Sequence, residues 1–161
     1  MKPNCVTTIQ TPMEVLIPLM REQLETGESV HFSPKGISML PMLRQGVDSV
    51  VLSPLPEKLQ KYDIPLYQRS NGHYVLHRVI HVGQTYTCMG DNQFVEEPGL
   101  LHSQMIGVVT GFYRKGKFHS VKEPGYRLYC RLWFHSRHIR RFIHRGIRFL
   151  GRMFQQKQER P

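Results

Sequence analysis

The spacing of apolar residues changes twice along the chain and divides it into three parts. Residues 1–28 show a helical period, residues 29–122 show short β-like runs between turn formers, and residues 123–161 return to a helical period. The middle part is long enough for one domain with a substantial core. The pattern therefore predicts a mainly β protein with a helix at each end.

The first predicted helix spans residues 11–27. Thr11 is suited to cap it, Pro12 suits the first helical position, and Gly27 ends it. We expect Pro18 to kink the helix. Because its apolar residues share one face, the helix is expected to pack on the domain.

Six strands are predicted in the middle part, where β-branched and aromatic residues alternate with turn formers. Asn71-Gly72 is a hairpin signal, and Gly83-Gln84 and Lys115-Gly116 are expected to form turns. Pro65 interrupts one run, which predicts an edge strand. The six predicted strands are Val30–Ser33, Ser49–Ser53, Ile64–Gln68, His73–Val82, Thr85–Met89 and Met105–Arg114.

The net charge of +10 is concentrated in the last part of the chain. Residues 1–125 hold 12 Lys and Arg against 11 Asp and Glu, whereas residues 126–161 hold 10 Lys and Arg against Glu159 alone. Apolar residues in 126–154 fall on one side at helical spacing, with arginines on the flanks and back. This part therefore predicts a basic amphipathic helix.

The three cysteines, Cys5, Cys88 and Cys130, have wide and irregular spacing. No CxxC or Cys/His metal pattern surrounds them, so we expect free thiols, no metal site and no cofactor. No run of 18 apolar residues is present, and the N-terminal sequence lacks the pattern of a signal peptide. Any contact with a membrane is expected to be peripheral.

Three stretches carry candidate chemistry. Lys35-Gly36-Ile37-Ser38-Met39-Leu40-Pro41 is a turn that presents Ser38, a candidate nucleophile, which needs a base and an oxyanion-stabilising environment. Tyr74-Val75-Leu76-His77-Arg78 holds a histidine, the usual base for a serine. Met89-Gly90-Asp91-Asn92 has the composition of a turn after a strand.

In this order, the three stretches resemble the type I signal peptidases, within the fold superfamily that also contains the LexA-like proteases. The combination Gly-x-Ser-Met-x-Pro, His-Arg-Val-Ile and Gly-Asp-Asn with an acid six residues later is similar to the branch that uses a Ser–His pair. The endoplasmic reticulum signal peptidase belongs to that branch. The resemblance covers about residues 29–118 and implies a small β-rich catalytic fold.

The resemblance also implies roles for individual residues. Ser38 is the expected nucleophile and His77 the expected general base. Asp91 orients the base or supports the site, and Glu97 stands at the second acidic position, where the Ser–His enzymes have Asp. The sequence leaves open which of these two carboxylates orients His77. Met39 and Pro41 are expected to shape the turn and the substrate pocket.

Gly36 marks a departure from many of these enzymes, which have serine two residues before the nucleophile. In those enzymes its hydroxyl donates to the oxyanion. With Gly36 at this position, we expect backbone N–H groups, including that of Ser38, to serve as the donors.

The basic helix stands where the signal peptidases have a membrane anchor. Its arginines and apolar residues suit the headgroup region of a membrane, so we expect peripheral attachment, on a side that the sequence does not define. Docking on an acidic or apolar protein is the alternative, and nucleic acid is not the expected partner. The residues expected to make the contact are Arg131, Trp133, Arg137, Arg141, Arg145 and Arg148.

These observations favour a serine endopeptidase that removes signal or leader segments from exported peptides or preproteins. Two alternatives remain on the same fold. One is a peptide- or membrane-binding module without activity, and the other is a LexA-like self-cleaving regulator. The second lacks support from an Ala-Gly cleavage site and from the lysine base of those proteins.

Overall fold

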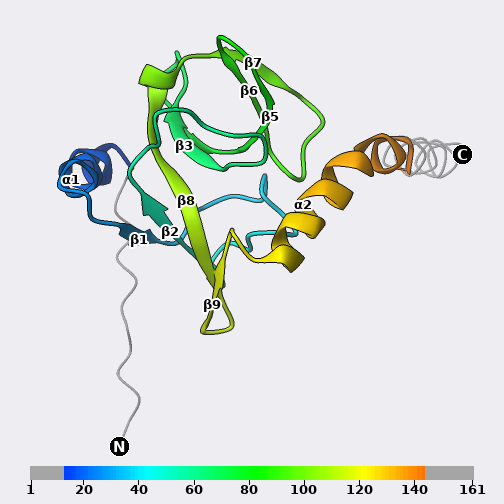
Figure 1. Cartoon of the computed structure of the whole chain (residues 1–161), viewed down its shortest axis with the longest axis horizontal. Helices are drawn as coiled ribbons and strands as arrows, with labels where there is room; N and C mark the ends of the chain where they lie inside the picture. The colour runs from blue at the N-terminus through cyan, green and yellow to red at the C-terminus, as the bar shows by residue number, and fades with distance from the viewer. Residues whose placement is uncertain (1–12, 144–161) are drawn as a thin grey trace, which may run out of the picture.

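The computed structural model describes residues 13–143, which form two antiparallel sheets with a helix at each end (Figure 1). Helix α1 spans Met13–Glu25 and helix α2 spans Pro124–His135, and residues 137–143 are again helical after a turn at Ser136. The strands are β1 Val30–Phe32, β2 Ser49–Ser53, β3 Pro65–Gln68, β4 Tyr74–Leu76, β5 Arg78–Val82, β6 Tyr86–Met89, β7 Glu97–Leu100, β8 Met105–Arg114 and β9 Lys117–Ser120.

The larger sheet has the strand order β1-β2-β8-β3-β4, and the smaller has the order β5-β6-β7. Strand β8 is the longest and pairs with three others: β2 along one side, and β3 and β9 in succession along the other. In Figure 1, α1 and α2 lie at opposite sides of the sheets, with β5, β6 and β7 above them.

Two apolar clusters fill the interior. The first joins α1, β1, β2 and part of β8 to apolar residues of the serine turn, among them Met39, Met42 and Leu43. The second lies between the two sheets and includes Tyr67, Val79 and Cys88. Because the candidate serine borders one cluster and the candidate histidine borders the other, the site lies where the two cores meet.

Much of the predicted architecture is confirmed. The protein is mainly β and is flanked by an N-terminal and a C-terminal helix. Strands β2 and β8 have the predicted bounds, and three more predicted strands each differ by one residue at one end. The predicted start of the first helix, at Thr11 and Pro12, lies outside the described residues.

The run His73–Val82 was predicted as one strand, and this prediction is wrong. It forms β4, which pairs with β3 of the larger sheet, and β5, which pairs with β6 of the smaller sheet. His77 is the residue between them. The break arises because the chain changes sheets at this point, which the apolar pattern of the run does not reveal.

The prediction of an edge position for Pro65 is also wrong, since β3 lies between β8 and β4. Pro65 is tolerated there because it is the first residue of the strand. Two strands were not predicted. β7 contains Pro98 and Gly99, and β9 is only four residues long, so neither has a strong strand pattern.

The turn predictions agree with the structure. Residues 69–73 close the β3–β4 hairpin, where the Gly72 N–H donates to the Arg69 carbonyl at 2.9 Å. Lys115 and Gly116 both have positive φ, 51° and 74°, as the turn between β8 and β9 requires. Cys88 and Cys130 are buried free thiols, as expected.

Candidate active site

The serine turn is anchored by burial of its apolar side chains. Met39, Met42 and Leu43 are buried, which fixes the turn on the first core cluster. The carboxylate of Asp48 is fully buried and accepts hydrogen bonds from the Arg44 guanidinium at 2.8 and 3.0 Å and from its backbone N–H at 2.9 Å. These hydrogen bonds close the loop that follows Ser38 and fix it beneath the half-buried serine.

Gly36 adopts φ +95°, a conformation that residues with a side chain rarely take. Its N–H donates to the Gln45 side-chain oxygen at 2.7 Å. Gly36 therefore shapes the turn through its backbone, and its own N–H is engaged away from a substrate. Pro41 is exposed, follows a cis peptide bond, and its carbonyl accepts a hydrogen bond from Arg114 at 3.2 Å.

His77 lies at the junction of the two sheets and is 1% exposed. A carboxylate oxygen of Glu97, at the start of β7, lies 3.1 Å from its Nδ1. Because a carboxylate only accepts, Nδ1 carries the proton and Nε2 is left with a lone pair. This is the tautomer that a general base for a serine requires.

Two further side chains hold Glu97. The Tyr67 hydroxyl donates to Glu97 Oε2 at 2.9 Å and lies 3.2 Å from His77 Nδ1. The Arg69 guanidinium donates to both carboxylate oxygens, through Nε at 2.8 Å and through Nη2. Tyr67, on β3, and Arg69, in the turn after β3, thus fix the carboxylate that contacts His77.

These surroundings set the charge states. Burial lowers the pKa of His77, and the Glu97 carboxylate opposes this effect only in part. Burial raises the pKa of Glu97, but hydrogen bonds from Arg69 and Tyr67 outweigh it and leave that pKa below its ordinary value. Near neutral pH the arrangement is therefore a neutral imidazole beside an ionised carboxylate, as a base needs.

Asp91 has a different environment. Its carboxylate accepts two hydrogen bonds of 2.7 Å from the Arg78 guanidinium, and both side chains are buried. Glu97 is therefore the carboxylate that contacts His77, and Asp91 pairs with Arg78, the residue after His77. The choice left open by the sequence is decided by this geometry.

The glycine-aspartate-asparagine turn joins the serine to the histidine. A Cβ placed on Gly90 would lie 2.7 Å from the Ser38 carbonyl oxygen and 3.1 Å from His77 Nε2. Only glycine allows this approach, so Nε2 faces the serine turn across Gly90. The Asn92 N–H also donates to the Ser38 carbonyl at 2.8 Å, which ties the two turns together.

A cavity of about 210 Å³ opens between the serine turn and His77. Ser38, Met39, His77 and Gln93 are among its lining residues. Within residues 13–143 the Ser38 hydroxyl has no hydrogen-bond partner, and neither has its backbone N–H. The hydroxyl is available to rotate toward Nε2, and the N–H is available to a substrate oxygen.

The predicted outward face of the basic helix differs in part from the structure. Trp133 and Arg137 lie against the domain. The Trp133 indole donates to the Asp91 carbonyl at 2.9 Å, and an Arg137 guanidinium nitrogen lies 3.7 Å from a carboxylate oxygen of Glu96. Each is half-buried, because this side of the helix covers the Asp91 turn. Arg131 and Arg141 are exposed as predicted, and Arg145 and Arg148 lie outside the described residues.

Sequence reasoning missed Tyr67, Arg69 and Gln93. Tyr67 is fully buried in a strand whose pattern is typical of core residues, and Arg69 follows that strand like any surface arginine. Both reach the site only because β3 lies beside β4 and β7 carries Glu97 to it. No local pattern marks that arrangement.

Comparison with protein-family models, with curated proteins and with solved structures finds no match. Among residues 13–143, no cluster of His, Cys, Asp and Glu has the arrangement of a metal site. Across the same residues, no helix has the length and apolar character to cross a membrane.

Proposed function

We propose that this protein is a serine endopeptidase of the signal-peptidase type, which removes signal or leader segments from exported peptides or preproteins. The observation that supports this most strongly is the Glu97–His77 contact beneath the Ser38 turn. It supplies an oriented base of the correct tautomer in a cavity that the serine lines. A buried histidine that served only the core would not need an ionised carboxylate held by two further side chains.

The proposed reaction proceeds by acyl transfer. Ser38 Oγ attacks the scissile carbonyl carbon while His77 Nε2 takes the hydroxyl proton, and the Ser38 N–H donates to the oxyanion. His77 then gives that proton to the leaving amine as the peptide bond breaks. Water, activated by the same Nε2, releases the second product and restores Ser38. Glu97 stabilises the imidazolium in both steps without taking the proton.

The substrate is proposed to bind in an extended conformation, with a small side chain in the cavity between Ser38 and His77. That cavity, at about 210 Å³, is too confined for a folded segment and admits a side chain of an extended one. Selection of small residues near the cut is what the resemblance to signal peptidases implies. An unstructured leader segment meets both requirements.

A cleavage assay tests this function. Ser38→Ala and His77→Ala are each expected to abolish cleavage of a leader-bearing peptide, because one removes the nucleophile and the other the base. Mass spectrometry of the products measures the result, and circular dichroism checks the fold. Ser70→Ala and His81→Ala, at exposed positions, are the matched controls and should cleave like the original protein. Full activity in both site variants would sink the proposal.

We further propose that the C-terminal helix attaches the enzyme to an anionic membrane surface. Five apolar side chains that point to solvent support this, because in one helical register they form a single stripe with Arg131 beside it. They are Leu128, Leu132, Ile139, Phe142 and Ile143, each more than half exposed. An acidic partner protein is the alternative occupant.

Vesicle sedimentation tests the attachment. The protein is expected to bind vesicles that contain phosphatidylserine and to bind neutral vesicles less, since the arginines add attraction to anionic lipid. Leu132→Asp should reduce binding more than Arg131→Gln, because it places a charge in the apolar stripe. Lys117→Gln, which removes the same charge from the β8–β9 hairpin outside the stripe, is the control. Equal binding by Leu132→Asp would contradict the proposed face.

A further inference from the structure

One peptide group connects the C-terminal helix to the serine turn. The carbonyl of Asp91 accepts hydrogen bonds from Trp133 Nε1 at 2.9 Å and from Arg140 Nη1 at 3.0 Å. The N–H of the same peptide group, which belongs to Asn92, donates to the Ser38 carbonyl at 2.8 Å. The carbonyl of this peptide group therefore binds the helix, and its N–H binds the backbone of Ser38.

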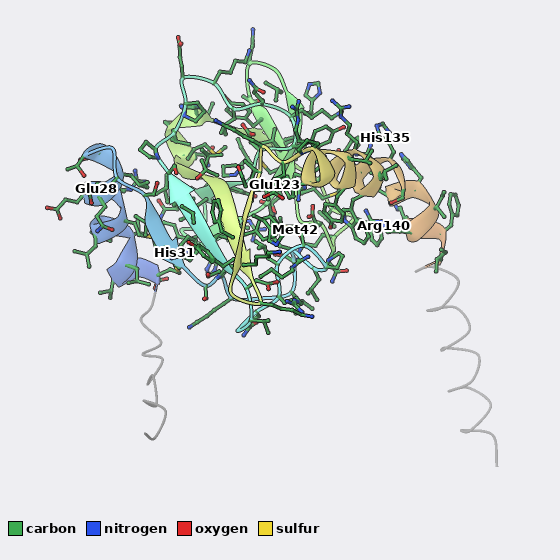
Figure 2. All side chains as sticks on the ribbon, turned by 60° about the horizontal axis from the view of Figure 1, so that its bottom comes forward. Glu28, His31, Met42, Glu123, His135 and Arg140 are labelled. Atoms are coloured by element: carbon green, nitrogen blue, oxygen red, sulfur yellow. The ribbon has the colours of Figure 1, made fainter. Side chains whose placement is uncertain are left out.

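Arg140 is held in place for this contact. Its guanidinium carbon lies 3.7 Å from the centre of the Trp133 ring, and its Nη2 donates to the Trp133 carbonyl at 2.8 Å. Its Nε reaches the Ser136 hydroxyl at 3.3 Å. Figure 2 shows Arg140 and the exposed His135 on different sides of the helix. The turn at Ser136 thus brings Trp133 and Arg140 together over one carbonyl.

A second link joins α2 to the histidine side. Arg78, which follows His77 and pairs with Asp91, donates from Nη1 to the Tyr126 hydroxyl at 3.0 Å and to the Cys130 sulfur at 3.1 Å. The helix therefore contacts the residue after the base and the turn behind the nucleophile. These contacts lie on the side of the helix opposite the exposed apolar stripe.

We propose that Trp133 and Arg140 are positioning residues for Ser38 and that they act through the Asp91–Asn92 peptide group. The proposal rests on the function proposed above. Since a peptide group is planar, fixing its carbonyl fixes the direction of its N–H. Donors on the carbonyl also polarise the group and strengthen the N–H as a donor. Within residues 13–143 the Ser38 side chain has no hydrogen-bond partner, so it is this contact with the Ser38 backbone that holds the turn at a set distance from His77.

Two variants test the proposal on cleavage of a soluble leader peptide. Trp133→Phe leaves an aromatic ring beside Arg140 and removes the indole N–H, and Arg140→Gln removes the guanidinium. Each is expected to lower kcat about tenfold, the scale of one lost hydrogen bond, with KM little changed, since the cavity is intact. Arg140→Lys should recover part of the loss because its ammonium can donate to the same carbonyl. Arg127→Gln, exposed on the same helix, should leave kcat unchanged.

Amide hydrogen exchange gives a readout that does not depend on cleavage. Both variants should speed exchange of the Asn92 N–H, while the Val109 N–H, which donates to the Ile64 carbonyl in the core, stays protected. If the original protein cleaves no peptide but Asn92 exchange responds, the link to Ser38 stands and the proposed function fails. If the original protein cleaves and both variants keep its kcat, the positioning role is overturned. Faster exchange at Val109 as well would show general loosening and would also overturn it.

Discussion

The two members of the proposed pair are supported in different ways. His77 is 1% exposed, and its Nδ1 contacts the Glu97 carboxylate and the Tyr67 hydroxyl. Ser38 is half-buried on a turn, and within residues 13–143 its backbone carbonyl is its only hydrogen-bonded group. The base is thus oriented by side chains that touch it, whereas the nucleophile is placed by its backbone. Variants that alter the support of His77 and variants that alter the support of Ser38 should therefore have different effects on activity.

The largest loss of activity is expected when the carboxylate that contacts His77 is removed. Glu97→Gln is expected to reduce kcat by about 10² to 10⁴, because the amide neither fixes the tautomer of His77 nor stabilises its charged form. Steady-state cleavage kinetics measure the loss. Glu96→Gln, at the exposed neighbouring acid, is the matched control and should stay within a few-fold of the original protein. Equal rates for the two variants would remove Glu97 from the site.

The largest loss of stability is expected at the buried Arg78–Asp91 pair, which lies next to both Ser38 and His77. Asp91→Asn leaves the Arg78 charge without its carboxylate, and we expect a loss of about 3 to 5 kcal/mol in the free energy of unfolding. Urea denaturation measures the change. Glu96→Gln is the comparison at an exposed pair, since the Glu96 side chain that contacts Arg137 is half exposed, and the loss there should be smaller. A loss under 1 kcal/mol for Asp91→Asn would show that the pair does not hold the turn.

A smaller effect is expected at the hydroxyl that supports the carboxylate. Tyr67→Phe removes the hydrogen bond to Glu97 and the contact with His77 Nδ1 but keeps the ring that fills the core. We expect kcat to fall about tenfold, the scale of one hydrogen bond to a charged group. Tyr113→Phe, on β8 outside the site, should not change kcat. An unchanged kcat in Tyr67→Phe would contradict this role and would indicate that Arg69 alone holds Glu97.

The smallest expected effect is a shift of the pH dependence of cleavage between the original protein and Glu97→Gln. His77 must be neutral to act, and burial lowers its pKa below the ordinary 6.5, so cleavage should rise with pH and the midpoint of the rise should lie below pH 6.5. Glu97 raises the pKa of His77, so Glu97→Gln should move this rise to lower pH. A cleavage profile of each protein measures the shift. A rise well above pH 7 would indicate a base other than His77.

The sequence predicts the features that depend on local pattern. The bounds of β2 and β8, the hairpin turns and the Ser38 turn follow from residues near one another in the chain. It does not predict the junction at His77, because the apolar residues on both sides of His77 and Arg78 read as one strand and do not reveal the change of partner strand. The choice between Asp91 and Glu97 depends on Tyr67 and Arg69, about 30 residues away from Glu97. Trp133 follows an amphipathic pattern that does not tell which side of the helix meets the domain.

The most direct test of the Ser38–His77 pair is covalent labelling with a fluorophosphonate probe, read by intact-mass spectrometry and peptide mapping. The probe is expected to add once, on Ser38, in the original protein, to be absent in Ser38→Ala, and to react far more slowly with His77→Ala. No adduct on Ser38, under conditions where a signal peptidase of the Ser–His type reacts, would contradict the account.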